Sequence, residues 1–128
     1  MKTILIADDD PDYLFQMKVK LERFGYRVIT ADSQKEAGRI LETVKPDLAI
    51  LDLMMETEDS GFILAHKISR MYPGLPVIIA SGVTAETGMD FGPAASGDRS
   101  LIKADLFIDK GITAERLERE IQNLMQKH

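Results

Sequence analysis

The sequence predicts an α/β fold of three layers, in which helices cover both faces of a five-stranded parallel sheet. Two observations lead to this prediction. Short apolar runs alternate five times with segments whose apolar residues recur at helical spacing. Polar or charged residues follow four of these runs directly, as expected where buried parallel strands end. Parallel strands joined by right-handed helical crossovers then favour the strand order 2-1-3-4-5.

The first two strands are expected at Thr3–Ala7 and Arg27–Thr30, because both runs are short, apolar and rich in β-branched residues. Between them, Asp10 is a candidate N-cap and Pro11 suits the first helical turn. Gly25 ends this helix. Its expected apolar face consists of Leu14, Met17, Leu21 and Phe24.

A second helix is expected to begin at Ser33, because Glu36 completes a capping box with it. Lys45–Pro46 ends this helix. Its buried stripe is expected to be Ala37, Ile40, Leu41 and Val44. The run Leu48–Leu51 then reads as a strand buried on both faces, and Asp52 stands where that strand ends.

A third helix carries Leu64, Ala65, Ile68 and Met71 and ends at Tyr72–Gly74. Residues 82–100 are rich in glycine, which predicts a long loop with at most one short helix near residues 99–104. The last helix begins near Thr113 and buries Leu117, Ile121, Leu124 and Met125. The two remaining strands are expected at Leu75–Ala80 and Leu106–Ile108.

Length and composition favour one globular domain, residues 1–128, with 45% hydrophobic and 29% charged residues. The absence of cysteine excludes disulfides and thiolate metal sites, and makes the cytoplasm the expected location. The apolar run near the start is too short for a signal peptide, and no run is long enough for a membrane span. The net charge of −5 argues against a general nucleic-acid binder. We therefore expect neither a membrane nor a nucleic-acid partner.

Polar residues at four strand ends are expected to meet at one edge of the sheet: Asp8, Asp9, Asp52, Ser81 and Lys110. Three carboxylates in one pocket repel one another, so one must be protonated or a divalent cation must bind. Oxygen ligands alone suit Mg²⁺. A cation, an ammonium and a hydroxyl together can accommodate a phosphoryl group.

These residues, in this order and over the whole chain, resemble the response-regulator receiver domain of two-component signalling, which has a flavodoxin-like fold. The pattern includes the acidic pair after TILIA, Asp52 with Met55 three residues later, Ser81-Gly82 after VIIA, and Lys110 with Phe107 three residues before it. The resemblance implies a phosphoacceptor switch that promotes its own phosphorylation and dephosphorylation without being a conventional enzyme.

The resemblance also implies roles for individual residues. Asp52 would accept a phosphoryl group from a histidine kinase or phosphotransfer protein. Asp9, Asp52 and the backbone carbonyl of Met54 would hold Mg²⁺, with Asp8 acting through water. Lys110 would bind the phosphoryl oxygens. Ser81 would move toward them, and Phe107 would follow as an aromatic switch that changes the surface seen by a downstream protein partner.

Two departures from the family pattern leave alternatives open. Gly111 replaces the usual proline after Lys110, and the segment between Ser81 and Phe107 is longer than usual. A degenerate receiver that binds partners without phosphorylation is therefore a second hypothesis. A third is a phosphatase that uses Asp8 as nucleophile and Asp10 as acid, although Asp10 is better explained as a helix cap.

Overall fold

The computed structural model describes residues 1–55, 57, 59–82 and 104–127. Its sheet has five parallel strands in the order β2-β1-β3-β4-β5, as predicted. The strands are β1 (Thr3–Ala7), β2 (Arg27–Ala31), β3 (Leu48–Asp52), β4 (Val77–Ser81) and β5 (Leu106–Asp109). The helices of the described residues are α1 (Pro11–Arg23), α2 (Gln34–Thr43), α3 (Ser60–Met71) and α6 (Ala114–Lys127).

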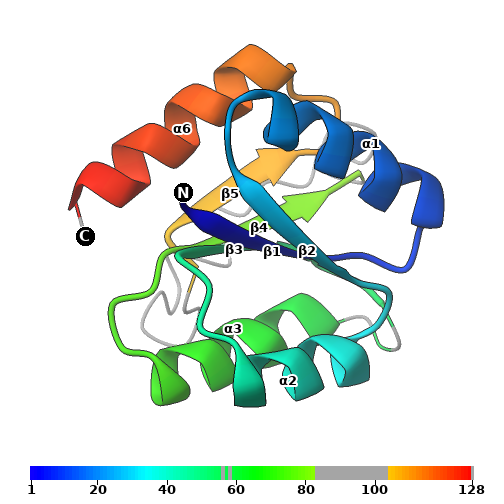
Figure 1. Ribbon diagram of the computed structural model, residues 1–128. Helices are drawn as coiled ribbons and strands as arrows, with labels where there is room; N and C mark the ends of the chain where they lie inside the picture. The colour runs from blue at the N-terminus through cyan, green and yellow to red at the C-terminus, as the bar shows by residue number, and fades with distance from the viewer. Residues whose placement is uncertain (56, 58, 83–103, 128) are drawn as a thin grey trace.

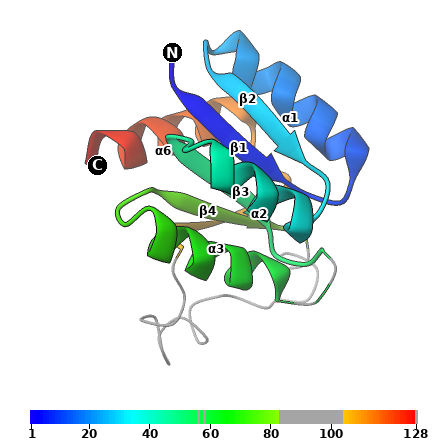
Figure 2. The same cartoon turned by 60° about the horizontal axis from the view of Figure 1, so that its bottom comes forward.

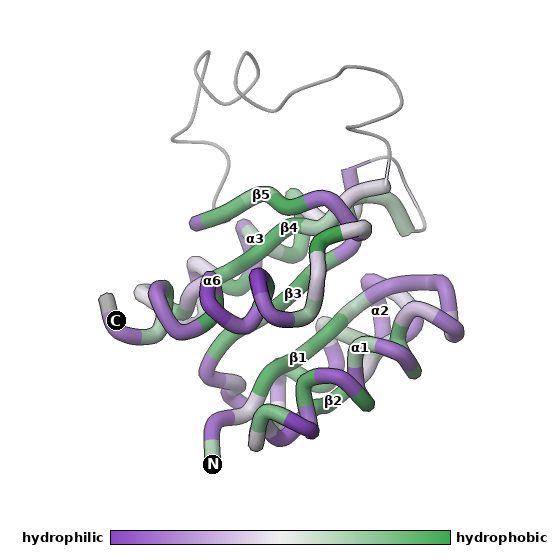
Figure 3. Tube along the Cα trace, turned by 90° about the horizontal axis from the view of Figure 1, so that it is seen from above, coloured by the Kyte–Doolittle hydropathy of each residue, from purple (hydrophilic) through white to green (hydrophobic). Residues whose placement is uncertain are grey.

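The sheet lies between two layers of helices. In Figure 1, α1 and α6 cover one face, and α2 and α3 cover the other. Figure 2 shows α2 and α3 running along the second face. The strands are hydrophobic along most of their length, whereas the helices alternate between polar and apolar residues (Figure 3). The predicted three-layer α/β fold is therefore confirmed.

Alternation along each strand divides the core into two clusters, because neighbouring side chains point to opposite faces. Ile4 and Ile6 of β1 pack with α1 and α6, whereas Leu5 and Ala7 pack with α2 and α3. All five residues of β3 are buried, including Asp52. A central strand covered on both faces explains the nearly unbroken apolar run in its sequence.

Helix termini follow the predicted capping chemistry. The Asp10 side chain accepts hydrogen bonds from the backbone N–H groups of Asp12 and Tyr13, and Pro11 occupies the first turn. Ser33 accepts a hydrogen bond from the backbone N–H of Glu36 at 3.0 Å. The Glu36 carboxylate itself pairs with Arg39.

Three predictions about side chains and boundaries were wrong. Val44 was placed in the buried stripe of α2, but it is the C-cap that follows Thr43 and is only half-buried. Phe24 was placed on the buried face of α1, but it is 41% exposed because the helix ends at Arg23 and Phe24 is already the C-cap. The following Gly25 has a φ of 95°, a conformation that glycine adopts without strain. The fourth strand begins at Val77, two residues later than predicted, since Leu75 and Pro76 belong to the turn that enters it.

The predicted short helix near residues 99–104 falls almost entirely outside the described residues. In the described part of the chain, no helix combines the length and the hydropathy needed to cross a bilayer.

Candidate functional site: a carboxylate cluster and a lysine at the sheet edge

Strand register brings the predicted polar residues to the same edge of the sheet. Ala7 of β1 is opposite Leu51 of β3, so the next residues, Asp8 and Asp52, emerge side by side. Ser81 of β4 is opposite Asp109 of β5, and Lys110 follows immediately. The Lys110 backbone N–H donates to the carbonyl of Ser81 at 3.1 Å, which anchors the start of the lysine loop to β4.

Three acidic side chains gather at this edge: Asp8, Asp9 and Asp52. One carboxylate oxygen from each lies within 4.8 Å of the others. Asp8 is completely buried and Asp52 is 7% exposed, whereas Asp9 is exposed. The backbone N–H of Asp10 donates to Asp8 Oδ1 at 2.9 Å, so the turn after β1 fixes the orientation of this carboxylate.

The Lys110 ammonium lies between the two buried carboxylates. Its Nζ is 2.7 Å from Asp8 Oδ2 and 3.2 Å from Asp52 Oδ1. Burial lowers the pKa of Lys110, but Asp8 and Asp52 together outweigh that effect and raise the pKa above its ordinary value. The lysine is therefore a fixed positive charge at the site.

One ammonium does not compensate three carboxylates. Burial and the neighbouring Asp8 raise the pKa of Asp52, and Lys110 lowers it. The net result is a pKa of about 6. When all four groups are ionised, three negative charges and one positive charge leave a formal charge of −2. The site thus favours either a proton on Asp52 or an added cation.

The donor set fits a hard divalent cation. The three carboxylates supply closely spaced oxygen ligands, and Asp9 is open to solvent for entry and for water ligands. Asp8 Oδ2 is buried and pairs with Lys110 Nζ at 2.7 Å.

The other predicted residues occupy different positions around the cluster. Ser81 is buried at the end of β4. Met54 lies in the loop after β3, with its side chain 40% exposed. Phe107 is half-buried against the hydrophobic cluster on the face of the sheet that α2 and α3 cover. Its ring meets that of Phe62 edge-on, with centroids 6.2 Å apart.

The carboxylate of Asp10 is engaged at the start of α1. Its carboxylate caps α1 through two backbone N–H groups, which confirms the capping interpretation. The same turn holds Asp8 through the Asp10 backbone, so Asp10 shapes the site without adding a ligand to the carboxylate cluster.

Two further residues shape the site without having been predicted. A Cβ on Gly61, in the first turn of α3, would lie 2.5 Å from the Asp52 carbonyl oxygen, so only glycine allows α3 to pack this closely against the end of β3. Tyr13 of α1 places its ring 4.9 Å from Lys110 Nζ. Spacing along α1 gave no signal for Tyr13, because a contact with a residue so distant in sequence has no local pattern.

The loop after Lys110 is closed by a side chain. Asp109 Oδ1 accepts a hydrogen bond from the backbone N–H of Gly111 at 2.7 Å. The proline that is usual in the family has no N–H and could not make this bond. The hydrogen bond from Gly111 to Asp109 therefore orders the lysine loop at the position where the family usually has a proline.

Residues 4–122 match the response regulator receiver domain family, and the chain belongs to that family. It is therefore a receiver domain of two-component signalling, as its motifs suggested.

Individual relatives agree with this assignment. The response regulator GtcR of Aneurinibacillus migulanus is 38% identical over 102 residues, which cover 80% of this chain and 41% of GtcR. The transcriptional regulatory protein GlrR of Escherichia coli is 43% identical over 76 residues, which cover 59% of this chain and 17% of GlrR. The chain thus spans less than half the length of these relatives.

Solved structures show the same fold. A CheY-like receiver domain protein from Methanospirillum hungatei superimposes with a TM-score of 0.84 at 25% identity, covering 99% of this chain and 95% of the other. The response regulator TrrA of Thermotoga maritima, solved in complex with Mg²⁺-BeF, gives a TM-score of 0.77 at 25% identity, with coverage of 97% and 99%.

Proposed function

We propose that the protein is a phosphoacceptor switch in which Asp52 receives a phosphoryl group from a histidine kinase or phosphotransfer protein. The observation that carries this proposal is the position of Asp52. Its carboxylate is nearly buried at the end of β3, 3.2 Å from a lysine ammonium and beside two further carboxylates. Family membership supports the same reaction.

The proposed transfer is a displacement at phosphorus. A carboxylate oxygen of Asp52 forms the new P–O bond while the bond from phosphorus to the donor breaks. The electron pair of that bond leaves with the donor, either an imidazole nitrogen of a phosphohistidine or the carboxylate of an acyl phosphate. Negative charge on the transferred oxygens is stabilised by the Lys110 ammonium, which already contacts Asp52.

Asp8 and Asp9 contribute to the same step through charge. With Asp52 and the Met54 backbone carbonyl, they are the proposed ligands of Mg²⁺, which when bound would neutralise carboxylate and phosphoryl charge. The relative solved with Mg²⁺-BeF supports this proposal by analogy. Asp8 also orients Lys110, because the ammonium lies closer to Asp8 than to Asp52.

Ser81 and Phe107 are the proposed links between the modified aspartate and the surface. Ser81 ends the strand beside β3, so its hydroxyl is well placed to respond to a phosphoryl group on Asp52. Phe107 lies on the neighbouring strand β5, half-buried against Phe62. A change in Ser81 would thus alter the packing of Phe107 and, with it, a surface recognised by a downstream protein.

The downstream partner of the protein is not identified by its relatives. Two kinds of relative carry names that describe response or transcriptional regulators, and this chain matches only part of each. The expectation that nucleic acid plays no part rests on net charge alone and stays a prediction.

One experiment separates the proposal from its alternatives. The protein is incubated with Mg²⁺ and acetyl phosphate, and the added phosphoryl group is followed by intact mass in wild type, Asp52→Asn and Asp8→Asn. The switch predicts a single phosphoryl group that is lost in Asp52→Asn. No modification in wild type would favour the phosphorylation-independent module. Modification that persists in Asp52→Asn but requires Asp8 would favour the phosphatase.

A further inference from the structure

We infer that Tyr13 is a positioning residue for Lys110, holding the ammonium against Asp8 and Asp52 from the side of α1. This inference rests on the proposed function, in which Lys110 stabilises the transferred phosphoryl group. The contact itself can be tested without phosphorylation.

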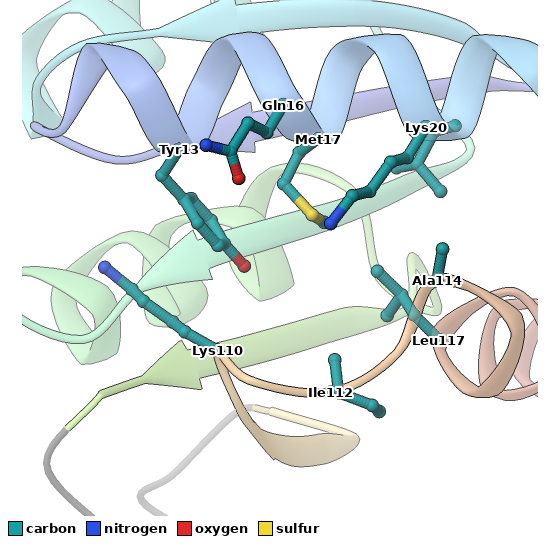
Figure 4. A pocket seen from close by; sticks show the side chains of 9 residues that line it. Tyr13, Gln16, Met17, Lys20, Lys110, Ile112, Ala114 and Leu117 are labelled. Atoms are coloured by element: carbon teal, nitrogen blue, oxygen red, sulfur yellow. The ribbon is translucent and has the colours of Figure 1, made fainter.

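The Tyr13 ring lies against the lysine amine. Lys110 Nζ is 4.9 Å from the ring centroid, within the range of a cation–π interaction. Figure 4 shows Tyr13 projecting from α1 toward the loop that carries Lys110. The ammonium therefore meets carboxylates on one side and the electron-rich face of an aromatic ring on another.

The hydroxyl of Tyr13 does not account for the placement of this residue. It is buried and makes no hydrogen bond to any part of the chain that the structure describes. A buried hydroxyl without a partner lowers stability. Burial and the carboxylates of Asp8, Asp52 and Asp109 raise the pKa of Tyr13, so the phenol stays neutral. Its ring packs against the edge of the core cluster beneath α1 and also contacts Lys110, and the second of these contacts bears on the site.

The space behind Tyr13 is too small to hold a ligand that would explain it. The pocket between α1 and the start of α6 measures about 50 Å³ and is lined in part by Tyr13, Met17, Lys110 and Leu117 (Figure 4). That volume holds only a few waters.

Tyr13 thus acts on the reaction through Lys110. The electron-rich face of the ring attracts the ammonium and so favours the position of the lysine side chain beside Asp8 and Asp52. This attraction keeps the positive charge where negative charge develops during transfer. A ring without the hydroxyl should do the same, whereas an aliphatic side chain, which has no such face, should not.

Rates of phosphorylation by acetyl phosphate with Mg²⁺ test this role. We expect Tyr13→Leu to be about fivefold slower than wild type, the equivalent of about 1 kcal/mol. Tyr13→Phe, the conservative variant, should restore the rate to within about twofold of wild type. Met17→Leu changes another residue of the same pocket without removing the ring, and serves as the packing control.

A double-mutant cycle separates positioning from a general structural effect. In the Lys110→Ala background, Tyr13→Leu should cause no further loss of rate, because the group that Tyr13 positions is gone. An equal loss in both backgrounds, or a Tyr13→Leu rate equal to wild type, would overturn the inference.

The contact is measured separately by ¹H–¹³C NMR of the unmodified protein. A ring facing the amine shifts the Lys110 methylene protons nearest to it upfield, and this shift should disappear in Tyr13→Leu but persist in Tyr13→Phe. An absent shift in wild type would overturn the inference whatever the rates. If the shift is present but wild type accepts no phosphoryl group, the proposed function fails while the contact stands.

Discussion

Lys110 forms an ion pair with Asp52, but Asp8 also binds the same ammonium. Lys110 Nζ is 3.2 Å from Asp52 Oδ1 and 2.7 Å from Asp8 Oδ2. One positive charge is therefore shared by two buried carboxylates. Asp52 is left partly uncompensated, which is why burial and Asp8 raise its pKa to about 6 in spite of the lysine. An undercompensated carboxylate near the surface is suited to accept a cation and then a phosphoryl group.

Removing the ammonium should affect both charge and reaction. Lys110→Met removes the interaction that lowers the pKa of Asp52, so that pKa should rise above 6. Phosphorylation by acetyl phosphate should slow by at least tenfold, because a charge that stabilises the transferred oxygens is lost. The pKa is measured from the carboxylate ¹³C shift and the rate by intact mass. Lys18→Met, which changes an exposed lysine of α1 outside the pocket that Tyr13 and Lys110 line, is the matched control. Equal rates in the two variants would contradict the role of Lys110.

Stability should depend on pH through Asp52. The pKa of Asp52 is about 6 in the folded protein and near 3.8 in the unfolded chain, so the folded state binds the proton more tightly. The contribution of protonated Asp52 to the free energy of unfolding is therefore fully present below pH 4 and is lost as pH rises through 6. This loss is no more than about 3 kcal/mol.

The comparison with Asp52→Asn isolates this effect from other carboxylates. Urea unfolding is measured without Mg²⁺ at several values between pH 4 and pH 7. The free energy of unfolding of Asp52→Asn should rise relative to that of wild type as pH rises. A difference that stays constant across this window would show that Asp52 titrates normally in the folded protein.

Two helical glycines should respond oppositely to alanine. In Gly61→Ala the new Cβ would lie 2.5 Å from the Asp52 carbonyl oxygen and 2.9 Å from Leu53 Cα. Both neighbours are backbone atoms that cannot move cheaply, so we expect a loss of about 1–3 kcal/mol in the free energy of unfolding. Displacement of α3 should also disturb Asp52.

Gly38→Ala is the control for that prediction. Its Cβ would meet Lys67 Nζ at 3.1 Å, the free end of a flexible side chain. Alanine is favoured over glycine within a helix, so this variant should gain about 0.5–1 kcal/mol. Thermal or urea unfolding measures both. Equal effects at the two positions would mean that the close approach at Gly61 does not constrain the site.

Phe62 should report the proposed movement of Phe107. The two rings meet edge-on with an interplanar angle of 69°. In protein labelled with fluorophenylalanine, addition of Mg²⁺ and beryllofluoride should shift the ¹⁹F resonances of both residues. Phe15, which is exposed on α1, should shift much less. Movement of the Phe15 signal alone would argue against Phe107 as the switch.

The sequence was sufficient for the fold because its strands and caps have local causes. The apolar run before Asp52 predicted a strand buried on both faces, and Asp10 with Pro11 predicted the start of α1. The convergence of Asp8, Asp52 and Lys110 also followed, since parallel strands present the same end to one edge of the sheet. These contacts needed only topology.

Features that depend on close packing could not be predicted. The sharing of Lys110 between two carboxylates and the contact with Tyr13 require side-chain positions from segments far apart in sequence. The approach of Gly61 to the Asp52 backbone requires the distance between α3 and β3. Phe24 continued a helical period beyond the end of its helix, because periodicity does not mark where a helix stops.

The central claim is that Asp52 carries the phosphoryl group, and chemical trapping of the modified residue tests it most directly. Borohydride reduces an aspartyl phosphate to homoserine, which peptide mass spectrometry locates in the sequence. After treatment with acetyl phosphate and Mg²⁺, we predict homoserine at position 52 alone, and none when Mg²⁺ is chelated. Homoserine at position 8, or at no position, would contradict the account.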